Sequence, residues 1–343
     1  MVVINHLIRV HKVTKKVSGT NPFLYFCAMK YLVNTNTHAH WNMAFDEFAL
    51  EGLDVQEPLF YLWQNAPAVI IGLNQSPYAE VNLPYLEEKG ILLARRVTGG
   101  GAVYHDLGNL NYSIVGPIRP MEQAFEIMPA ALRRLGVPAE RSGRNDILVE
   151  GRKCSGYAKR LSRDRMMIHG TLMWDVDLDV LTEALKTPGS KVSAKGIASV
   201  RSRVANLKDY LPQFPTLEAF RAALQEVLAD GDGEYPLTAA QREAVDRETR
   251  EKFGTWEWNF GHSPETTHQG RKKFACGTVE VLYSLKNGVL TEVTFQGDFL
   301  GNRPAEELAE VLKGKRPEEL AALDVSAWFD GLDGPSFASL FEA

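Results

Sequence analysis

The sequence has few cysteines, no long hydrophobic run and no strongly basic region. Its three cysteines, Cys27, Cys154 and Cys276, are scattered and form no C-x-x-C pair, which argues against a disulfide framework or a zinc site. We therefore expect a protein of the reducing cytoplasm. No apolar run approaches the length of a membrane span. A formal net charge of −5, with no segment rich in Lys and Arg, argues against a partner nucleic acid.

Length and composition favour a globular protein with more than one domain. The chain has 343 residues, of which 45% are hydrophobic and 24% charged. Residues 1–28 combine basic residues with a short apolar run in an arrangement unlike a signal peptide, so we expect a dispensable extension. A polar stretch at 262–273 predicts a linker. These features divide the chain into a large domain, 29–261, and a small one, 263–343.

The order of predicted elements favours an α+β fold, with mixed or antiparallel sheets packed by helices. The predicted helices are 40–53, 121–135, 178–185, 217–228 and 238–253. The predicted strands are 59–63, 68–72, 91–95, 110–115, 146–149, 152–157, 168–174, 278–285 and 289–295. Asn287-Gly288, between two runs of alternating apolar residues, predicts a hairpin in the small domain.

The most informative segment reads Arg95-Arg96-Val97-Thr98-Gly99-Gly100-Gly101-Ala102-Val103-Tyr104-His105-Asp106. We call its three consecutive glycines the glycine turn. Without Cβ atoms, a ligand can lie directly against main-chain N–H groups, and two guanidiniums at the start of the turn favour an anion. The segment is neither a Walker loop nor a dinucleotide fingerprint, because no Gly-Lys-Ser/Thr follows and the glycines do not open a helix. Alone, it could equally be a tight β-turn.

Four further segments carry candidate chemistry. They are Gly143-Arg144-Asn145-Asp146, Arg152-Lys153-Cys154-Ser155-Gly156, His169-Gly170-Thr171-Leu172, and a loop at 187–203 that contains Lys195. Each alone could be an ordinary surface segment with a solvated cation. Together they supply fixed cations and main-chain donors, which the attack of a carboxylate on the α-phosphorus of ATP requires.

These motifs, in this order, resemble those of bacterial lipoate–protein ligase A, of the biotin/lipoate ligase superfamily. The resemblance runs from about Met29 to the C-terminus and includes Trp256-Glu257-Trp258-Asn259-Phe260-Gly261, at the junction with the family's accessory domain. It implies a fold related to the biotin-ligase catalytic domain. It also implies a reaction in two steps: lipoate and ATP form lipoyl-AMP and pyrophosphate, and the lysine of an acceptor protein then displaces AMP.

The resemblance also implies roles for individual residues. Lys153 matches the catalytic lysine that binds the carboxyl end and the α-phosphate, and Arg96 matches an arginine near the phosphate. The main-chain cradle for adenylate corresponds to Gly99, Gly100, Gly101, Ala102, Val103 and Tyr104. Asn145 and Asp146 line the nucleotide side, where Asp146 would help to hold magnesium. Weaker candidates are His105, Arg160, His169 and Lys195, the last in a loop that orders over the adenylate.

The implied ligands are ATP with magnesium, and lipoate as substrate, without a tightly bound prosthetic group. The implied partners are lipoyl domains of 2-oxoacid dehydrogenase E2 subunits or the glycine-cleavage H protein, with neither nucleic acid nor membrane, and we expect a monomer. Lipoate and octanoate cannot be distinguished, since both have an aliphatic arm ending in a carboxylate. We also expect the small domain to change orientation between the two half-reactions.

Two alternatives stay open from the residues alone. The first is an ATP-independent octanoyl or lipoyl transferase that forms a thioester on Cys154, although alternation along a strand would turn Cys154 toward the core if Lys153 faces the ligand. The second is a binder of lipoate or its adenylate that has no activity of its own. In the adenylation hypothesis the carboxylate is already ionised, so His105 and His169 are not required as general bases.

Overall fold

The computed structural model describes residues 29–75, 77–121, 123–143, 145–185, 202–260, 268–286 and 288–341. The expected extension, residues 1–28, lies outside them, as do Arg144, Lys195 and most of the predicted loop 187–203. Among the described residues, no helix is both long and apolar enough to cross a membrane.

The large domain is built on a mixed eight-stranded sheet in the order β11-β1-β2-β6-β10-β9-β8-β7. Its strands are β1 (Met29–Val33), β2 (Leu59–Trp63), β6 (Asn109–Pro117), β7 (Ala139–Ser142), β8 (Asp146–Val149), β9 (Arg152–Ser162), β10 (Arg165–Met173) and β11 (Ala229–Glu234). A second, three-stranded sheet has the order β4-β3-β5, from β3 (Ala68–Ile71), β4 (Leu92–Arg95) and β5 (Val103–His105). The glycine turn connects β4 to β5, so this small sheet sets its position.

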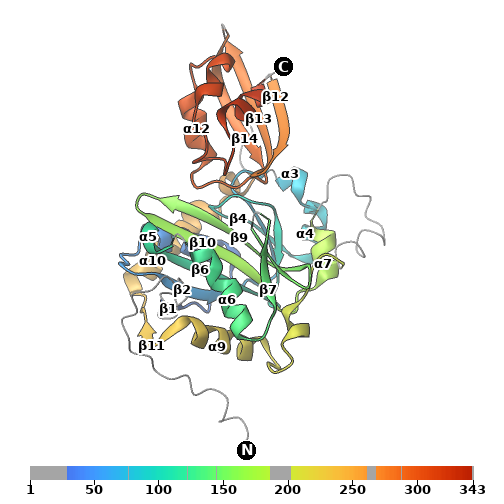
Figure 1. Cartoon of the computed structure of the whole chain (residues 1–343), viewed down its shortest axis with the longest axis vertical. Coiled ribbons are helices and arrows are strands. Elements are labelled where there is room, and N and C mark those ends of the chain that lie inside the picture. Colours follow the sequence, from blue (N-terminus) through green and yellow to red (C-terminus); the bar gives the residue numbers. More distant parts are fainter. Residues whose placement is uncertain are drawn as a thin grey trace, which may run out of the picture.

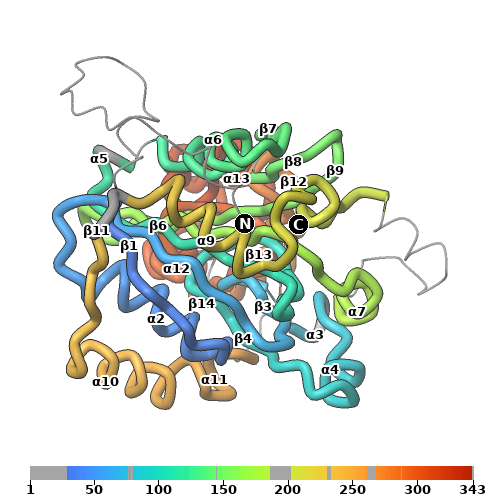
Figure 2. The backbone as a smooth tube through the Cα atoms, turned by 90° about the horizontal axis from the view of Figure 1, so that it is seen from below, coloured from blue at the N-terminus to red at the C-terminus, as the bar shows by residue number. Residues whose placement is uncertain are grey.

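Helices cover both faces of the large sheet (Figures 1 and 2). The helices of this domain are α2 (Ala39–Glu51), α3 (Pro77–Glu80), α4 (Leu83–Lys89), α5 (Ile118–Met121), α6 (Ile127–Arg134), α7 (Leu178–Ala184), α9 (Leu217–Leu228), α10 (Ala239–Glu248) and α11 (Trp256–Asn259). Helices α6 and α9 share one apolar core with the sheet, and α2 shares a second core with Val245 of α10 on the other side. Burial of these apolar faces is the main stabilising contribution to this layered arrangement.

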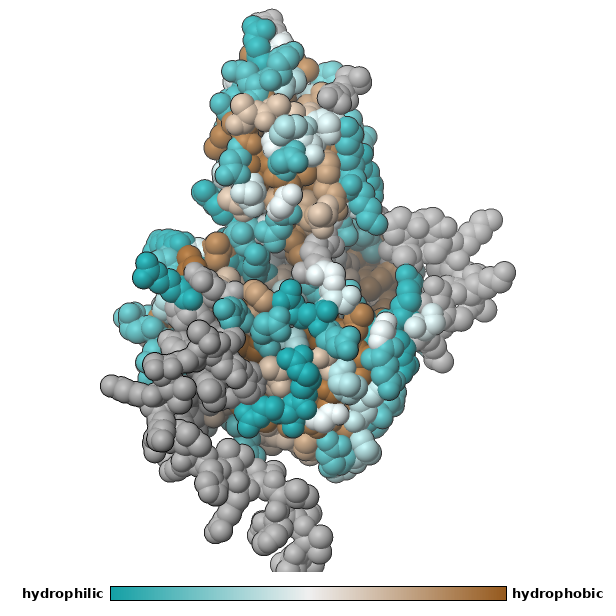
Figure 3. Space-filling model, viewed as in Figure 1, coloured by the Kyte–Doolittle hydropathy of each residue, from teal (hydrophilic) through white to brown (hydrophobic). Residues whose placement is uncertain are grey.

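The small domain, described here as residues 268–341 and called the accessory domain below, has its own apolar core. It contains the antiparallel sheet β12 (His268–Phe274), β13 (Gly277–Lys286) and β14 (Val289–Gly297), packed by α12 (Ala305–Leu312) and α13 (Gly334–Ala338). Figure 1 shows it, in orange and red, at one end of the large domain. Figure 3 shows polar side chains spread over both domains on the same face.

Three main-chain hydrogen bonds join the accessory domain to the large one. Gly100 N–H donates to the Phe299 carbonyl (3.0 Å), Gly297 N–H to the Asn74 carbonyl (2.7 Å), and Leu161 N–H to the Asn302 carbonyl (2.9 Å). The first of these places the accessory domain directly on the glycine turn.

The structure differs from the prediction in several elements. The predicted helix 121–135 is divided into α5, a 3₁₀ turn at Ala124–Glu126 and α6. Half of the predicted linker at 262–273, residues 268–273, lies in β12, whose side chains are mostly exposed and show no apolar alternation, and residues 262–267 lie outside the described residues. Strands β7 and β11 had no counterpart in the prediction, because Glu, Arg, Asp and Gly dominate them.

Candidate active site

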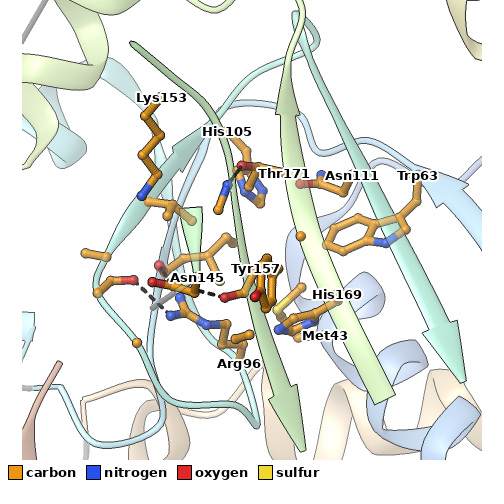
Figure 4. A pocket seen from close by; sticks show the side chains of 18 residues that line it. Met43, Trp63, Arg96, His105, Asn111, Asn145, Lys153, Tyr157, His169 and Thr171 are labelled. Atoms are coloured by element: carbon orange, nitrogen blue, oxygen red, sulfur yellow. Dashed lines mark hydrogen bonds between the residues drawn. The ribbon is translucent and has the colours of Figure 1, made fainter. Parts of the chain in front are cut away.

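A cavity opens in the large domain between the glycine turn and strands β9 and β10 (Figure 4). Its empty space, including the solvent at the open mouth, is about 610 Å³. The lining residues are Met43, Trp63, Ile70, Arg96, Gly100, Gly101, Ala102, Val103, His105, Asn111, Asn145, Lys153, Gly156, Tyr157, Ala158, His169, Gly170 and Thr171. In Figure 4, Lys153 and Asn145 lie at one side of the cavity, and Trp63 and Asn111 at the other.

Each glycine of the turn has a different structural setting. An ideal Cβ on Gly99 would lie 2.4 Å from the Phe299 carbonyl oxygen, so the accessory domain leaves no space for a side chain there. Gly100 has φ of +92°, in the region that favours glycine. A Cβ on Gly101 would meet nothing within 4 Å, and this residue is exposed. Gly100 and Gly101 line the cavity, whereas Gly99 lies against the accessory domain.

Arg96 is buried and holds the glycine turn in shape. Its guanidinium donates to the carbonyls of Gly99 (2.7 Å) and Gly101 (2.9 Å), and also to the carbonyl of Ile70 (3.1 Å) on β3. Burial, with a smaller contribution from Arg95, lowers the pKa of Arg96 to about 10, so it remains charged at neutral pH. Most of its hydrogen bonds therefore go to the protein's own main chain.

Arg95 has a comparable role on the other side of β4. It donates to main-chain carbonyls at the end of β3 and at α11, and burial lowers its pKa to about 10. The α11 carbonyls belong to Trp258 and Asn259, in the segment that the family resemblance placed at the domain junction. Arg95 thus ties that junction to the sheet that carries the glycine turn.

Lys153 lies at the cavity mouth, on the hairpin of β8 and β9. The hairpin turn is tight because Glu150 and Gly151 both have positive φ, of 50° and 76°. Lys153 Nζ lies 2.7 Å from Asp146 Oδ1, and both side chains are about 40% exposed (40% and 38%). Its main chain also pairs with the segment after the predicted loop: Lys153 N–H donates to the Arg203 carbonyl, and Ala205 N–H to the Lys153 carbonyl. The position of Lys153 is therefore fixed on two sides, while its ammonium remains accessible.

Cys154 faces away from the cavity. Its side chain is fully buried in the apolar core, and burial raises the pKa of its thiol to about 12. The alternation expected for this strand is thus found, with Lys153 toward the cavity and Cys154 toward the core. A buried thiol that stays protonated is a poor nucleophile. This argues against the transferase mechanism in which Cys154 forms a thioester with the acyl group.

A buried hydrogen-bond chain connects α2 to the glycine turn. His169 Nδ1 lies 2.6 Å from Asp46 Oδ2, and His169 Nε2 lies 2.7 Å from Thr98 Oγ1. Asp46 Oδ1 accepts hydrogen bonds from Tyr61 (2.5 Å) and Ser113 (2.8 Å), so this carboxylate is well paired although it is 1% exposed. Both ring nitrogens of His169 are therefore engaged, which argues against its use as a general base.

His105 is also buried, and a chain of amides fixes its tautomer. Asn42 Nδ2 donates to Asn65 Oδ1 (2.8 Å), so the Asn65 amide presents Nδ2 to His105 Nδ1 at 3.1 Å. His105 Nδ1 is then the acceptor, and the proton of the neutral ring lies on Nε2. Burial, together with the charge of Arg96, lowers the pKa of His105 to about 3, so it is uncharged at neutral pH.

The other predicted site residues lie around the cavity or outside it. Tyr104 is buried next to the lining residues, and Asn145 donates to the Tyr157 carbonyl (2.8 Å). Arg160 lies outside the cavity, in the crevice beside the accessory domain, and donates to the Val97 carbonyl (2.9 Å). The prediction missed Asp46, Met43, Trp63, Asn111 and Thr171. Asp46 could have been recognised from the sequence, because it lies four positions after Asn42 on the apolar face of a predicted helix, where an acidic residue is unusual.

The described residues contain no group of three or more His, Cys, Asp or Glu side chains able to hold a metal ion. Asp146 has the hard oxygen donor that magnesium prefers, and it lies at the mouth beside Lys153. A single carboxylate fits a metal that arrives with a phosphate ligand, because such sites use one or two carboxylates together with substrate oxygens.

Two family models match the chain. Residues 38–229 match the lipoyl protein ligase A/B catalytic domain, and residues 263–340 match the bacterial lipoate protein ligase C-terminus. The chain belongs to the lipoate–protein ligase family. The resemblance carried by the sequence motifs is thereby confirmed.

Curated relatives of the lipoate–protein ligase family match most of the chain. Lipoate-protein ligase LplJ of Bacillus subtilis is 38% identical over 294 residues, covering 83% of this chain and 89% of its own length. Lipoate–protein ligase 1 of Staphylococcus aureus is 36% identical over 319 residues, covering 89% and 97%. These relatives are ligases, and this protein is an enzyme of the same class.

Solved lipoate–protein ligases have the same fold. A bipartite ligase of Thermoplasma acidophilum, solved in work that includes its E2 lipoyl domain, aligns with a TM-score of 0.62 and 30% identity, covering 70% of this chain and 99% of that one. A lipoate-protein ligase A bound with ATP aligns with a TM-score of 0.59 and 30% identity, covering 68% and 99%. The predicted α+β architecture with a small accessory domain is confirmed.

Proposed function

We propose that this protein is an ATP-dependent lipoate–protein ligase that forms lipoyl-AMP and then transfers the lipoyl group to a lysine of an acceptor protein. The observation that carries the proposal is the cavity itself. Main chain of the glycine turn and the ammonium of Lys153 bound it near the mouth, and buried apolar and uncharged side chains bound its interior. Such a cavity suits an aliphatic acid whose carboxylate stays near the mouth.

In the first step, the lipoate carboxylate attacks the α-phosphorus of ATP, and pyrophosphate leaves. Negative charge gathers on the phosphate oxygens between the two groups. Lys153 lies at the mouth with an ammonium that could exchange its contact with Asp146 for contacts to these oxygens, as a compact point charge. The glycine turn would offer main-chain N–H groups to the same oxygens once Gly100 N–H leaves the Phe299 carbonyl, and Arg96 holds the carbonyls of Gly99 and Gly101.

In the second step, the neutral amine of the acceptor lysine attacks the acyl carbon, AMP leaves with the bonding electron pair, and the attacking nitrogen loses one proton to solvent to give the amide. Neither His105 nor His169 offers a free basic nitrogen, since Nδ1 of His105 already accepts a hydrogen bond from Asn65 and both ring nitrogens of His169 are engaged. We therefore assign no general base to these histidines. Lys153 would again stabilise the charge that develops on the leaving phosphate.

Magnesium would be held by Asp146 together with phosphate oxygens. When bound, the metal ion would neutralise phosphate charge. Asp146 would then leave Lys153 free to contact the reacting oxygens. We propose no tightly bound prosthetic group, because the cofactor chemistry of this reaction enters with ATP.

The proposed acceptors are E2 lipoyl domains or the H protein of glycine cleavage, and the archaeal ligase studied with its E2 lipoyl domain supports the first. Incubation with each acceptor and mass spectrometry of the acceptor would separate them. We further propose a cytoplasmic monomer with residues 29–261 as catalytic domain, 263–343 as accessory domain and 1–28 dispensable. Sedimentation of the full chain tests whether the protein is a monomer, and sedimentation of a form lacking residues 1–28 tests whether these residues are dispensable for folding.

The accessory domain would have to move for the glycine turn to bind phosphate through Gly100. That N–H now donates to Phe299, so a phosphate oxygen can accept it only after this contact breaks. Scattering profiles of the free protein and of the adenylate-bound protein should therefore differ. Identical profiles would remove this part of the proposal.

The test of the main proposal is lipoate-dependent exchange of labelled pyrophosphate into ATP by purified protein without an acceptor. Exchange is expected, because adenylation is reversible before the second step. A folded protein that shows no exchange but still transfers acyl groups without ATP would overturn the proposal.

A further inference from the structure

Two buried polar groups in the cavity wall have no hydrogen-bond partner among the described residues. They are Nε2 of His105 and Nδ2 of Asn111, on side chains that are 3% and 1% exposed. Both residues line the cavity. A buried donor left without a partner costs about 1–3 kcal/mol, so two of them in one wall call for a physical reason.

Both atoms are hydrogen-bond donors. The Asn65 amide donates to Nδ1 of His105, which leaves the ring proton on Nε2. Asn109 Nδ2 donates to Oδ1 of Asn111 (2.8 Å), which leaves the Asn111 NH₂ group without a partner. The neighbouring side chains therefore fix both residues so that each keeps one buried N–H without a partner among the described residues.

Asn111 lies away from the chemical end of the cavity, and the ring of His105 lies beside that of Trp63, with 6.1 Å between the ring centroids. In Figure 4, Asn111 and Trp63 lie on the side opposite Lys153 and Asn145. Met43, Trp63 and Ile70 are also buried in this part of the wall, and they supply apolar surface. With the carboxylate near Lys153, the distal end of a bound acid would reach these two donors.

We propose that His105 and Asn111 form a specificity pair that recognises the distal end of the acid. The pair favours an acid whose distal end carries weak acceptor atoms, such as the two sulfurs of a cyclic disulfide, over a plain alkyl acid of similar length. Divalent sulfur accepts a hydrogen bond weakly, whereas a terminal methyl group cannot accept one. A plain alkyl chain would displace solvent from this end and leave both N–H groups unpaired. This inference rests on the proposed function and adds a preference for lipoate over octanoate.

The test compares lipoate and octanoate in the pyrophosphate-exchange reaction, using kcat/KM for each acid. In Asn111→Leu, which removes the donor and keeps a similar volume, the lipoate-to-octanoate ratio of kcat/KM should fall about 3–10-fold. His105→Phe should lower the ratio in the same direction. The matched control is Met43→Leu, another buried residue of the same wall, which should change both acids by the same factor and leave the ratio within about twofold.

The outcomes separate this inference from the proposed function. An unchanged ratio in Asn111→Leu and in His105→Phe, with exchange still measurable, would overturn the specificity pair and leave the ligase proposal standing. Wild-type protein that exchanges pyrophosphate with neither acid would instead contradict the ligase proposal. If Asn111→Leu does not fold, Asn111→Ala removes the same donor without adding bulk, and the lipoate-to-octanoate ratio of that variant is the test. The shift of Tm with each acid gives a binding readout that does not depend on turnover.

Discussion

The glycine turn and the β8–β9 hairpin both form the wall of the cavity, and they differ in how fully their polar groups are paired. Arg96 of the turn is buried, and its guanidinium is bonded to three main-chain carbonyls. Lys153 of the hairpin is 40% exposed and has one ion pair, with Asp146. The first cation maintains a shape, while the second can change partners at low cost, since exposed ion pairs contribute about 0–1 kcal/mol. Two cations in one site can thus have different tasks.

The largest effect is expected on the hairpin side. Lys153→Ala should slow both half-reactions by about 10²–10³-fold, because one preorganised charge is lost where charge develops. Its thermal unfolding should change little, since the side chain is half exposed. The measurement is pyrophosphate exchange together with transfer from preformed lipoyl-AMP.

The control for that variant is Lys208→Ala, another half-exposed lysine with one carboxylate partner, Asp175. Near-normal adenylation by Lys153→Ala would contradict the role of Lys153 and would remove the contrast between the two regions.

Arg96→Met should show the opposite balance between stability and activity. Removal of a buried guanidinium leaves the carbonyls of Ile70, Gly99 and Gly101 without their donor, which should lower the free energy of unfolding by about 3 kcal/mol. Urea denaturation measures this change. Arg141→Met, at a partly exposed arginine paired with Glu126, is the control and should cost less than about 1 kcal/mol. Lost activity with unchanged stability would mean that Arg96 serves the ligand rather than the turn.

A smaller effect is expected on the pH dependence of stability, through the buried His105 in the cavity wall. The folded-state pKa of His105 is lowered to about 3 from its ordinary value of 6.5, so the unfolded chain binds a proton first as the pH falls. The contribution of His105 to stability is complete above about pH 6.5 and is lost progressively toward pH 3. From pH 7 to pH 5, the wild type should lose about 2 kcal/mol more unfolding free energy than His105→Gln.

Urea denaturation at the two pH values checks this difference. His38→Gln, at an exposed histidine, is the control and should follow the wild type closely. Parallel pH profiles of the wild type and His105→Gln would show that His105 is not held neutral by its surroundings.

The smallest effect on activity is expected for Cys154, which lies on the hairpin but faces the apolar core. Cys154→Ala should retain lipoate-dependent pyrophosphate exchange within about threefold, because the thiol is buried in the core and its pKa is raised to about 12. The same enzyme preparation should be tested for acyl transfer without ATP. Loss of all acyl transfer in this folded variant would support the mechanism in which Cys154 forms a thioester.

The parts of the site that depend on neighbouring residues could be predicted from the sequence. Strand alternation predicted that Lys153 and Cys154 face opposite sides, and the helix 217–228 has the bounds of α9. The Asn-Gly signal predicted the hairpin between β13 and β14. In each of these cases, the residues that decide the structure are a few positions apart.

The parts that depend on distant residues could not be predicted in this way. Asp46 and His169 are 123 positions apart, and nothing local to either residue indicates that they pair. The strand β12 lacks an apolar alternation because it lies at the edge of the accessory sheet with mostly exposed side chains. Arg96 looked like a free cation for phosphate, because the main-chain carbonyls that it contacts become its neighbours only after folding.

The three consecutive glycines of the turn would respond differently to a methyl group. At position 99 it would collide with the accessory domain, and at position 100 it would strain the main chain. At position 101 a methyl group would meet no atom of the described residues within 4 Å. The fold therefore gives no reason for the third glycine. Its small size would therefore matter to a bound ligand. Gly101→Ala would test how closely the ligand approaches the main chain, and we expect this variant to leave the fold unchanged.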